Sequence, residues 1–149
     1  MQGLWRPRFN WHALASTYST SSATNVSTGH GTSLVAGGTG VLEIVSTAVA
    51  SNATQNDASQ VALYESTIGI PAAGAAPASG DTLIYQTTRT RSTANSNSET
   101  TSHIVRTGLV TGTTYYYYHA AAAPGGGTTS LVGGNNQTTI MVRTMPQMG

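Results

Sequence analysis

Cysteine and lysine are both absent from the 149-residue sequence. Without cysteine the chain has no disulfide, no thiolate ligand for zinc and no cysteine nucleophile. Without lysine it has no side-chain amine for Schiff-base chemistry. These absences exclude several common forms of catalysis and leave stability to packing and assembly.

Charge is also scarce. Asp, Glu, Lys and Arg make up 7% of the residues and the formal net charge is +1, whereas charged residues are about a quarter of an average soluble domain. The basic patch typical of nucleic-acid-binding proteins is missing, so we expect no nucleic acid partner. A chain with so little charge does little to repel its own copies, and we expect an assembly to cover much of its surface. The alternative is an extracellular domain kept soluble by its 41 Ser and Thr residues.

Long apolar runs are missing as well. No segment approaches the ~20 apolar residues that a membrane-spanning helix needs. The N-terminal segment has two arginines but no unbroken apolar stretch after them, unlike a secretory signal. We therefore expect no membrane partner and synthesis in the cytoplasm.

The most strand-like stretch covers residues 109–123 and holds four of the seven tyrosines. Strand alternation places Tyr115 and Tyr117 on one face, and Tyr116 and Tyr118 on the other. Both faces are large and apolar. Either both are covered within the domain, or one tyrosine pair packs on a partner.

Similar but weaker segments recur along the chain, separated by Gly, Pro, Ser and Asn, with no convincing helix. This pattern predicts an all-β antiparallel β-sandwich, either immunoglobulin/fibronectin III-like or a jelly roll. Gly29-His-Gly31 is predicted to be a turn, residues 71–80 a flexible loop and residues 90–100 a hairpin loop. The other predicted strands are 14–19, 41–49, 60–66, 82–89, 102–106, 128–132 and 137–144.

Residues 1–13 differ from the rest of the chain, because they hold every Trp and Phe. Pro7 interrupts regular strand pairing, and the aromatic spacing fits neither a helix nor a clean alternation. We predict an extended N-terminal arm over 1–13, rather than a strand, and a single domain over 14–149. Trp and Arg often anchor interfaces, so the arm either inserts into a neighbouring subunit or folds back on its own domain.

No catalytic, cofactor or metal site is predicted. The four histidines lie in separate segments, and none forms a pair at metal-ligand spacing. The acidic residues are scattered, so no catalytic carboxylate pair can be assigned. We expect His119 to be a packed, hydrogen-bonded core residue and the protein not to be an enzyme.

Leu109, Gly112, Thr113 and Tyr115 resemble the tyrosine corner of fibronectin type III and immunoglobulin-like sandwiches. Thr111 stands where proline is usual. The resemblance implies that Tyr115 points inward, with its hydroxyl bonded to the backbone a few residues upstream. Such a corner indicates a fold and not a function.

A second resemblance covers most of the chain from about Gly40 on. The order of features is an aromatic arm, a Val-Ala-Leu-Tyr strand, Gly80-Asp-Thr-Leu-Ile84, the tyrosine strand and a glycine-rich hairpin. It is similar to small β-sandwich virion proteins of tailed bacteriophages, notably capsid decoration (cement) proteins. The resemblance implies a protein on the outer surface of the capsid, commonly a homotrimer. Such a protein binds the major capsid protein and stabilises contacts between capsid subunits.

Under this interpretation the arm aromatics anchor the protein, the arm arginines pair with capsid acids, and two tyrosines line a contact between subunits. The predicted partner-binding residues are Trp5, Arg6, Arg8, Phe9, Trp11, Tyr116 and Tyr118. The alternative is a carbohydrate- or receptor-binding β-module of a tail fibre or adhesin, with exposed Trp and Tyr rings stacking on sugars.

Overall fold

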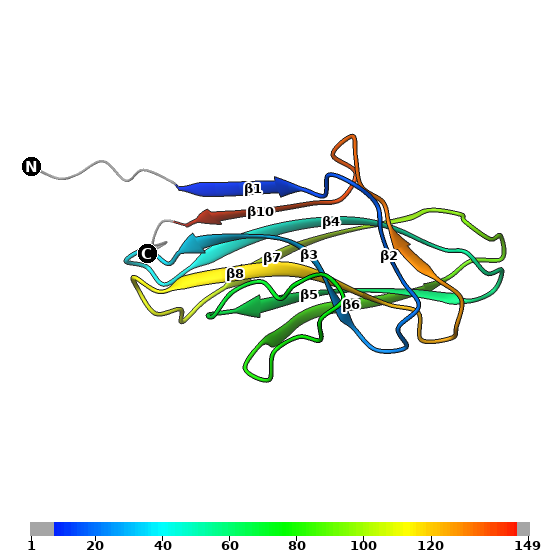
Figure 1. The fold of residues 1–149 in the computed structure, drawn as a ribbon. Coiled ribbons are helices and arrows are strands. Elements are labelled where there is room, and N and C mark those ends of the chain that lie inside the picture. Colours follow the sequence, from blue (N-terminus) through cyan, green and yellow to red (C-terminus); the bar gives the residue numbers. More distant parts are fainter. Residues whose placement is uncertain (1–7, 146–149) are drawn as a thin grey trace, which may run out of the picture.

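The computed structural model describes residues 8–145, and all regular elements in that range are β-strands. They pack as two layers, face to face (Figure 1). The predicted all-β antiparallel sandwich is confirmed. No helix long and apolar enough to cross a membrane occurs among these residues. The strands are β1 (Phe9–Ala13), β2 (Tyr18–Thr20), β3 (Val26–Val35), β4 (Leu42–Asn52), β5 (Ala58–Ser66), β6 (Thr82–Thr90), β7 (Ser98–Arg106), β8 (Thr114–Ala122), β9 (Thr129–Leu131) and β10 (Thr139–Thr144).

The strand order is that of a jelly roll. Sheet B has the order β3-β8-β5-β6. In sheet A, β4 pairs with β7 along one edge; its other edge pairs with β10 at the start of β4 and with β9 at the end. β1 then lies outside β10, and β2 outside β9. With β1/β2 and β9/β10 each taken as one interrupted strand, both sheets have four strand positions in jelly-roll order. The jelly-roll alternative is therefore the one observed.

The predicted hairpin loop and the predicted turn at Gly29-His-Gly31 are both wrong. β6 and β7 belong to different sheets, so residues 90–100 form a crossover and not a hairpin. Gly29-His-Gly31 lies inside β3, where the register against β8 shifts between Ser27 and Gly31. Gly29 has a φ of +71°, a conformation that glycine supplies in a β-bulge. Glycine is depleted in strands, which is why the sequence pattern did not predict β3.

The core lies between the sheets and includes the inward-facing tyrosines of β8. Tyr115 and Tyr117 are buried among aliphatic side chains of both sheets. The Val110 backbone N–H donates a 3.0 Å hydrogen bond to the Tyr115 hydroxyl. The predicted tyrosine corner is confirmed, here at a turn of a jelly roll.

Tyr115→Phe removes that hydrogen bond and leaves the part-buried Val110 N–H without its acceptor. We expect a loss of about 1 kcal/mol in the free energy of unfolding, measured by urea denaturation. Tyr116→Phe is the matched control, since the Tyr116 hydroxyl makes no hydrogen bond to residues 8–145. Equal stability of the two variants would contradict a structural role for the corner.

The outer face of sheet B is covered by the loop between β5 and β6. Tyr118 is fully buried there, stacked on Tyr64 with ring centroids 5.5 Å apart. Its hydroxyl donates to Asp81 Oδ2 at 2.7 Å. The loop, predicted to be flexible, exchanges two backbone hydrogen bonds with Ser27 of β3, at 2.7 and 2.8 Å. Around Tyr118, both faces of the tyrosine strand are thus covered within the domain.

Candidate interaction surface

The N-terminal segment contains a strand where an arm was predicted. β1 pairs antiparallel with β10, with Phe9 opposite Arg143 and Trp11 opposite Met141. The prediction that the segment is not a strand is wrong for Phe9–Ala13, because five residues carry too little periodicity to distinguish a strand from an arm. Trp5 and Arg6 lie outside the described residues, and the boundary between arm and domain stays a prediction.

Two side chains, one in β1 and one just before it, attach this segment to sheet B. Asn10 Nδ2 donates to the Ser33 carbonyl oxygen, and Arg8 Nη2 donates to the Val35 carbonyl oxygen at 3.2 Å. Both acceptors belong to β3, the edge strand of sheet B. The β1 side of the sandwich is therefore closed by hydrogen bonds between the two sheets.

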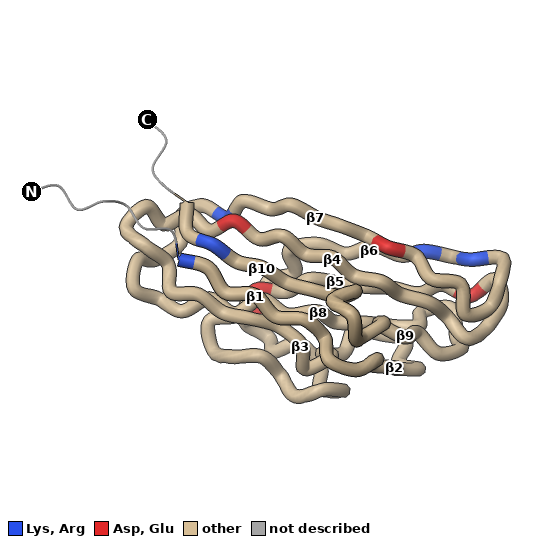
Figure 2. The backbone as a smooth tube through the Cα atoms, turned by 90° about the horizontal axis from the view of Figure 1, so that it is seen from above, with Lys and Arg blue, Asp and Glu red and all other residues tan. Residues whose placement is uncertain are grey.

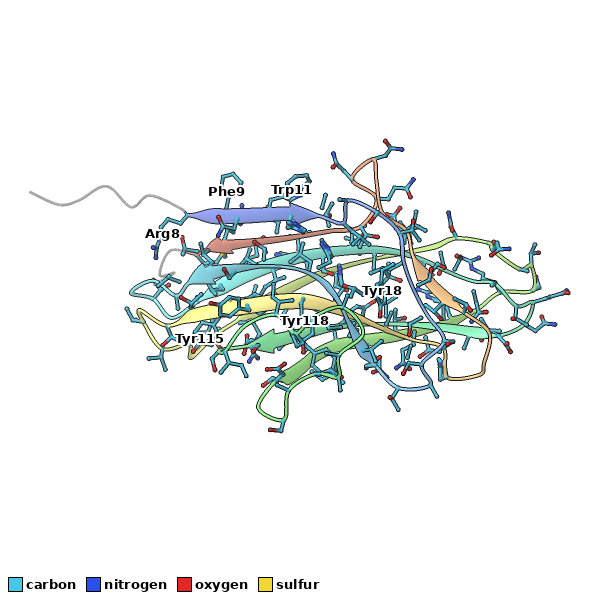
Figure 3. All side chains as sticks on the ribbon, viewed as in Figure 1. Arg8, Phe9, Trp11, Tyr18, Tyr115 and Tyr118 are labelled. Carbon is cyan, nitrogen blue, oxygen red and sulfur yellow. The ribbon has the colours of Figure 1, made fainter. Side chains whose placement is uncertain are left out.

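The outer side of β1 carries two exposed aromatic rings. Phe9 is 66% exposed and Trp11 is 50% exposed. Both rings point away from the body of the molecule (Figure 3). In contrast, Tyr115 lies between the two sheets, and Tyr118 lies between sheet B and the loop that covers it. Large aromatics exposed side by side on one strand are unusual for a surface that faces only water.

The strand register continues this surface across sheet A. Phe9 is followed by Arg143, Glu43 and Val105 on successive strands, and Trp11 by Met141, Val45 and His103. Residues directly opposite each other share a face at close distance. We call this surface the aromatic face; its residues are Phe9, Trp11, Glu43, Val45, His103, Val105, Met141 and Arg143.

A neutralised ion pair lies at the centre of the aromatic face. Arg143 donates to both Glu43 carboxylate oxygens, at 2.7 and 2.9 Å. His103 Nε2 lies 2.8 Å from Glu43 Oε1. The hydrogen bonds from Arg143, more than any other interaction, lower the pKa of the Glu43 carboxyl. Because this buried charge already has its partners, an apolar surface can cover it without leaving a charge unpaired.

Charges are sparse over the rest of the molecule too. Figure 2 shows most of the backbone free of charged residues. The second two-pronged ion pair joins Arg106 of β7 to Glu65 of β5, at 2.8 and 2.9 Å. The Tyr117 hydroxyl donates to the same carboxylate at 2.7 Å. In each ion pair the two residues are far apart in the sequence. The positions of the acidic residues in the sequence therefore gave no indication of either pair.

Three histidines cluster where β1, β3 and β8 meet: His30 and His119 are buried in the interior, whereas His12 lies exposed on β1. His12 Nδ1 lies 2.7 Å from His30 Nδ1, and the His30 and His119 rings stack with centroids 5.2 Å apart. His119 Nε2 is 2.7 Å from the Ser46 hydroxyl, which confirms His119 as a packed, hydrogen-bonded core residue. Their sequence spacing carries no signal for this cluster; only the fold brings them together.

The buried histidines are held neutral. Burial, and to a lesser extent His12, lowers the pKa of His30 to about 4. Burial lowers the pKa of His119 well below its ordinary value, with a smaller effect from His30. His30 Nε2 and His119 Nδ1 have no hydrogen-bond partner among residues 8–145. Within that range no three His, Cys, Asp or Glu side chains are arranged to hold a metal ion.

The two predicted interface tyrosines differ in accessibility. Tyr116 is half-buried, whereas Tyr118 is fully buried under the β5–β6 loop. A side chain without exposed surface makes no direct contact with another subunit, so the predicted role of Tyr118 finds no support. Burial, followed by the hydrogen bond to Asp81, raises the pKa of Tyr118.

No protein-family model matches the sequence, and no curated protein matches it. Among solved structures, the chain is similar to the Eiger TNF from S. frugiperda, with a TM-score of 0.57 and 11% identity over 97% of this chain and 96% of that chain. At this identity the likeness shows the fold alone. The likeness to VP2 in the infectious bursal disease virus subviral particle is weaker, with a TM-score of 0.45 and 14% identity. It covers 97% of this chain but only 38% of VP2 and supports no functional assignment.

Proposed function

We propose that the chain is a non-enzymatic virion structural protein, a capsid decoration protein that binds the outside of the assembled head shell. The aromatic face is the observation that carries this proposal. Exposed Phe9, Trp11 and Val105 surround a carboxylate that already has its partners. Exposed apolar surface of this kind is characteristic of protein interaction sites. The low overall charge supports the same role.

Stabilisation would follow from mass action. A protein that binds the assembled shell but not free capsid subunits adds its binding free energy to the stability of the shell. Arg8 lies exposed immediately before β1, and Trp5 and Arg6 precede it in the sequence. Together with Phe9 and Trp11 of the aromatic face, they are the proposed contacts with the major capsid protein. The aromatic rings would anchor the contact, and the arginines would pair with capsid carboxylates in a two-pronged geometry.

Substitution tests this role better than deletion, since removing residues 1–13 would also remove β1 and His12. A variant combining Trp5→Ala, Arg6→Ala and Arg8→Ala is expected to bind empty shells of the source particle at least ~10-fold more weakly than the wild-type protein. Co-sedimentation with shells measures this binding.

Ile68→Ala is the control and should bind like the wild-type protein. Ile68 is 76% exposed, and it lies on the loop after β5, outside both the arm and the aromatic face. Wild-type binding by the triple variant would remove the arm from the proposal. Absence of shell binding by the wild-type protein would overturn the decoration role itself.

Carbohydrate binding is the second candidate, favoured by the position of the two exposed rings. Phe9 and Trp11 lie two residues apart on one strand face, about 7 Å along the strand. Rings so placed could stack on successive sugars of a glycan. Glycan binding by the wild-type protein that Trp11→Ala abolishes, without shell binding, would favour this candidate.

A further inference from the structure

We infer that His12 and His30 form a binding site for a divalent transition metal ion, with water completing the coordination. The two histidines belong to β1 and β3, and they meet on the side of β1 opposite to the exposed Phe9 and Trp11 rings. The site goes beyond the proposed function and leaves the aromatic face and the arm to the shell contact.

The two histidines already present ring nitrogens to each other. His12 Nδ1 and His30 Nδ1 are 2.7 Å apart. A zinc–nitrogen bond is about 2.0–2.1 Å long, so two nitrogens on one ion lie roughly 2.9 Å apart at a right angle and roughly 3.3 Å apart at a tetrahedral angle. Moving the rings apart by about 0.2–0.6 Å would give both nitrogens the spacing of metal ligands.

The contact also requires a ring nitrogen that is free to bind a metal. Two nitrogens at hydrogen-bond distance need one donor and one acceptor, so only one of the two Nδ1 atoms carries a proton. A metal ion takes the place of this shared proton and binds both nitrogens. One proton is then released to the solvent for each ion bound.

The fold fixes one ligand and leaves the other accessible. His30 is 1% exposed, and its ring stacks on His119. It lies at the β-bulge of β3, where the register against β8 shifts between Ser27 and Gly31. Bulges of this kind re-aim side chains beside functional sites. His12 lies exposed on β1, so the ion and its water ligands can reach the pair from the surface.

The ligands determine the class of metal. Imidazole nitrogens suit Zn²⁺, Ni²⁺ and Cu²⁺, whereas Mg²⁺ and Ca²⁺ prefer oxygen ligands. No third His, Cys, Asp or Glu side chain completes the set within residues 8–145. His30 Nε2 has no hydrogen-bond partner in that range, whereas the histidines of strong metal sites donate from their second nitrogen. We therefore expect reversible binding, weaker than that of a structural zinc site.

Metal binding is coupled to folding, because residues 12 and 30 meet only in the folded chain. The backbone of β1 pairs with β10, and the side chains of Asn10 and Arg8 attach this segment to sheet B. An ion between His12 and His30 would add a further link between the edge strands of the two sheets. Because the ion needs both histidines, its binding free energy adds to the stability of the folded protein.

Titration of the wild-type chain with Zn²⁺, in the absence of shells, tests the inference. Isothermal titration calorimetry near neutral pH should show one Zn²⁺ ion bound per chain and no binding of Mg²⁺. His12→Ala, at an exposed position, should weaken zinc binding at least ~10-fold, a loss that even substitutions outside the ligand shell commonly cause. His103→Gln is the matched control, because it removes an exposed histidine beside Glu43. It should bind zinc like the wild-type protein.

Nuclear magnetic resonance identifies the ligands. The Nδ1 resonances of His12 and His30 should shift on addition of Zn²⁺, whereas those of His103 should not. Zinc should raise the urea midpoint of the wild-type protein and leave that of His12→Ala unchanged. Absence of zinc binding by the wild-type protein, or binding of equal strength by His12→Ala, would overturn the site. Neither result affects co-sedimentation with shells, which tests the decoration role separately.

Discussion

Acidification from pH 7 to pH 4 is expected to lower the free energy of unfolding by about 3 kcal/mol through His30 alone. Its pKa is about 4 in the folded protein, against 6.5 for an ordinary histidine. Between these values the unfolded chain binds the proton and the folded chain does not, so stability falls as the pH falls. Each pKa unit corresponds to 1.36 kcal/mol. The contribution is fully present above pH 6.5 and is lost progressively toward pH 4.

Two other groups change stability in the same direction. His119 has a lowered pKa for the same reason, and it adds to the loss. The Glu43 pKa is also lowered from 4.5, so its stabilising effect begins to be lost only near the acid end of this range. Urea denaturation at a series of pH values measures the sum.

The His30→Leu variant isolates the histidine effect. Its stability should depend less steeply on pH between 6.5 and 4 than that of the wild-type protein. His103→Gln, at an exposed histidine, should keep the steep dependence. Equal wild-type stability at pH 7 and pH 4 would mean that the histidine cluster is accessible to protons in the folded state.

Gly31→Ala should destabilise the protein by more than about 4 kcal/mol, the range of exceptional core substitutions. A Cβ atom at Gly31 would collide with the Tyr117 carbonyl oxygen. It would also lie 2.8 Å from Tyr118 Cβ and 2.9 Å from Ile70 Cδ1. The carbonyl belongs to the neighbouring strand β8, so relief requires the two strands to separate.

Gly38→Ala is the matched control. No atom lies within 4 Å of a Cβ atom at Gly38, and its φ is not in the left-handed region. We expect its unfolding free energy to stay within about 0.5 kcal/mol of the wild-type value. The measurement is the urea concentration at the midpoint of unfolding, compared among the wild-type protein, Gly31→Ala and Gly38→Ala. A Gly31→Ala midpoint equal to that of Gly38→Ala would contradict the close approach of β3 and β8.

Strands rich in β-branched and aromatic residues could be predicted from the sequence, and β4, β5, β6, β8 and β10 all lie close to their predicted positions. β3 could not be predicted, because its glycines are typical of a turn. The β-bulge that accounts for them is visible only in the structure. The sequence also did not indicate which sheet each strand joins. The loop between β6 and β7 has the composition of a hairpin loop, but it connects strands of different sheets. Local patterns report local conformation, whereas crossovers depend on the whole fold.

The candidate surface was predictable by residue type and not by arrangement. Phe9 and Trp11 were recognisable as unusual aromatics, but their shared face depends on pairing with β10. Glu43 and Arg143 are 100 residues apart, and no spacing rule connects them. Tyr118 was predicted to line a contact between subunits but is buried within the domain. The small residues of the β5–β6 loop gave no indication that this loop covers the tyrosine.

The pairing of β1 with β10 joins strands that are synthesised first and last among those described. On the ribosome β1 has no partner strand until β10 has emerged, so sheet A stays incomplete while the strands between them are synthesised. Long-range pairing of this kind slows folding. In that interval the β1 strand of one nascent chain can pair with β10 of another. Crowded synthesis would therefore favour exchange of the N-terminal strand between copies, a domain swap that dilution during refolding should suppress.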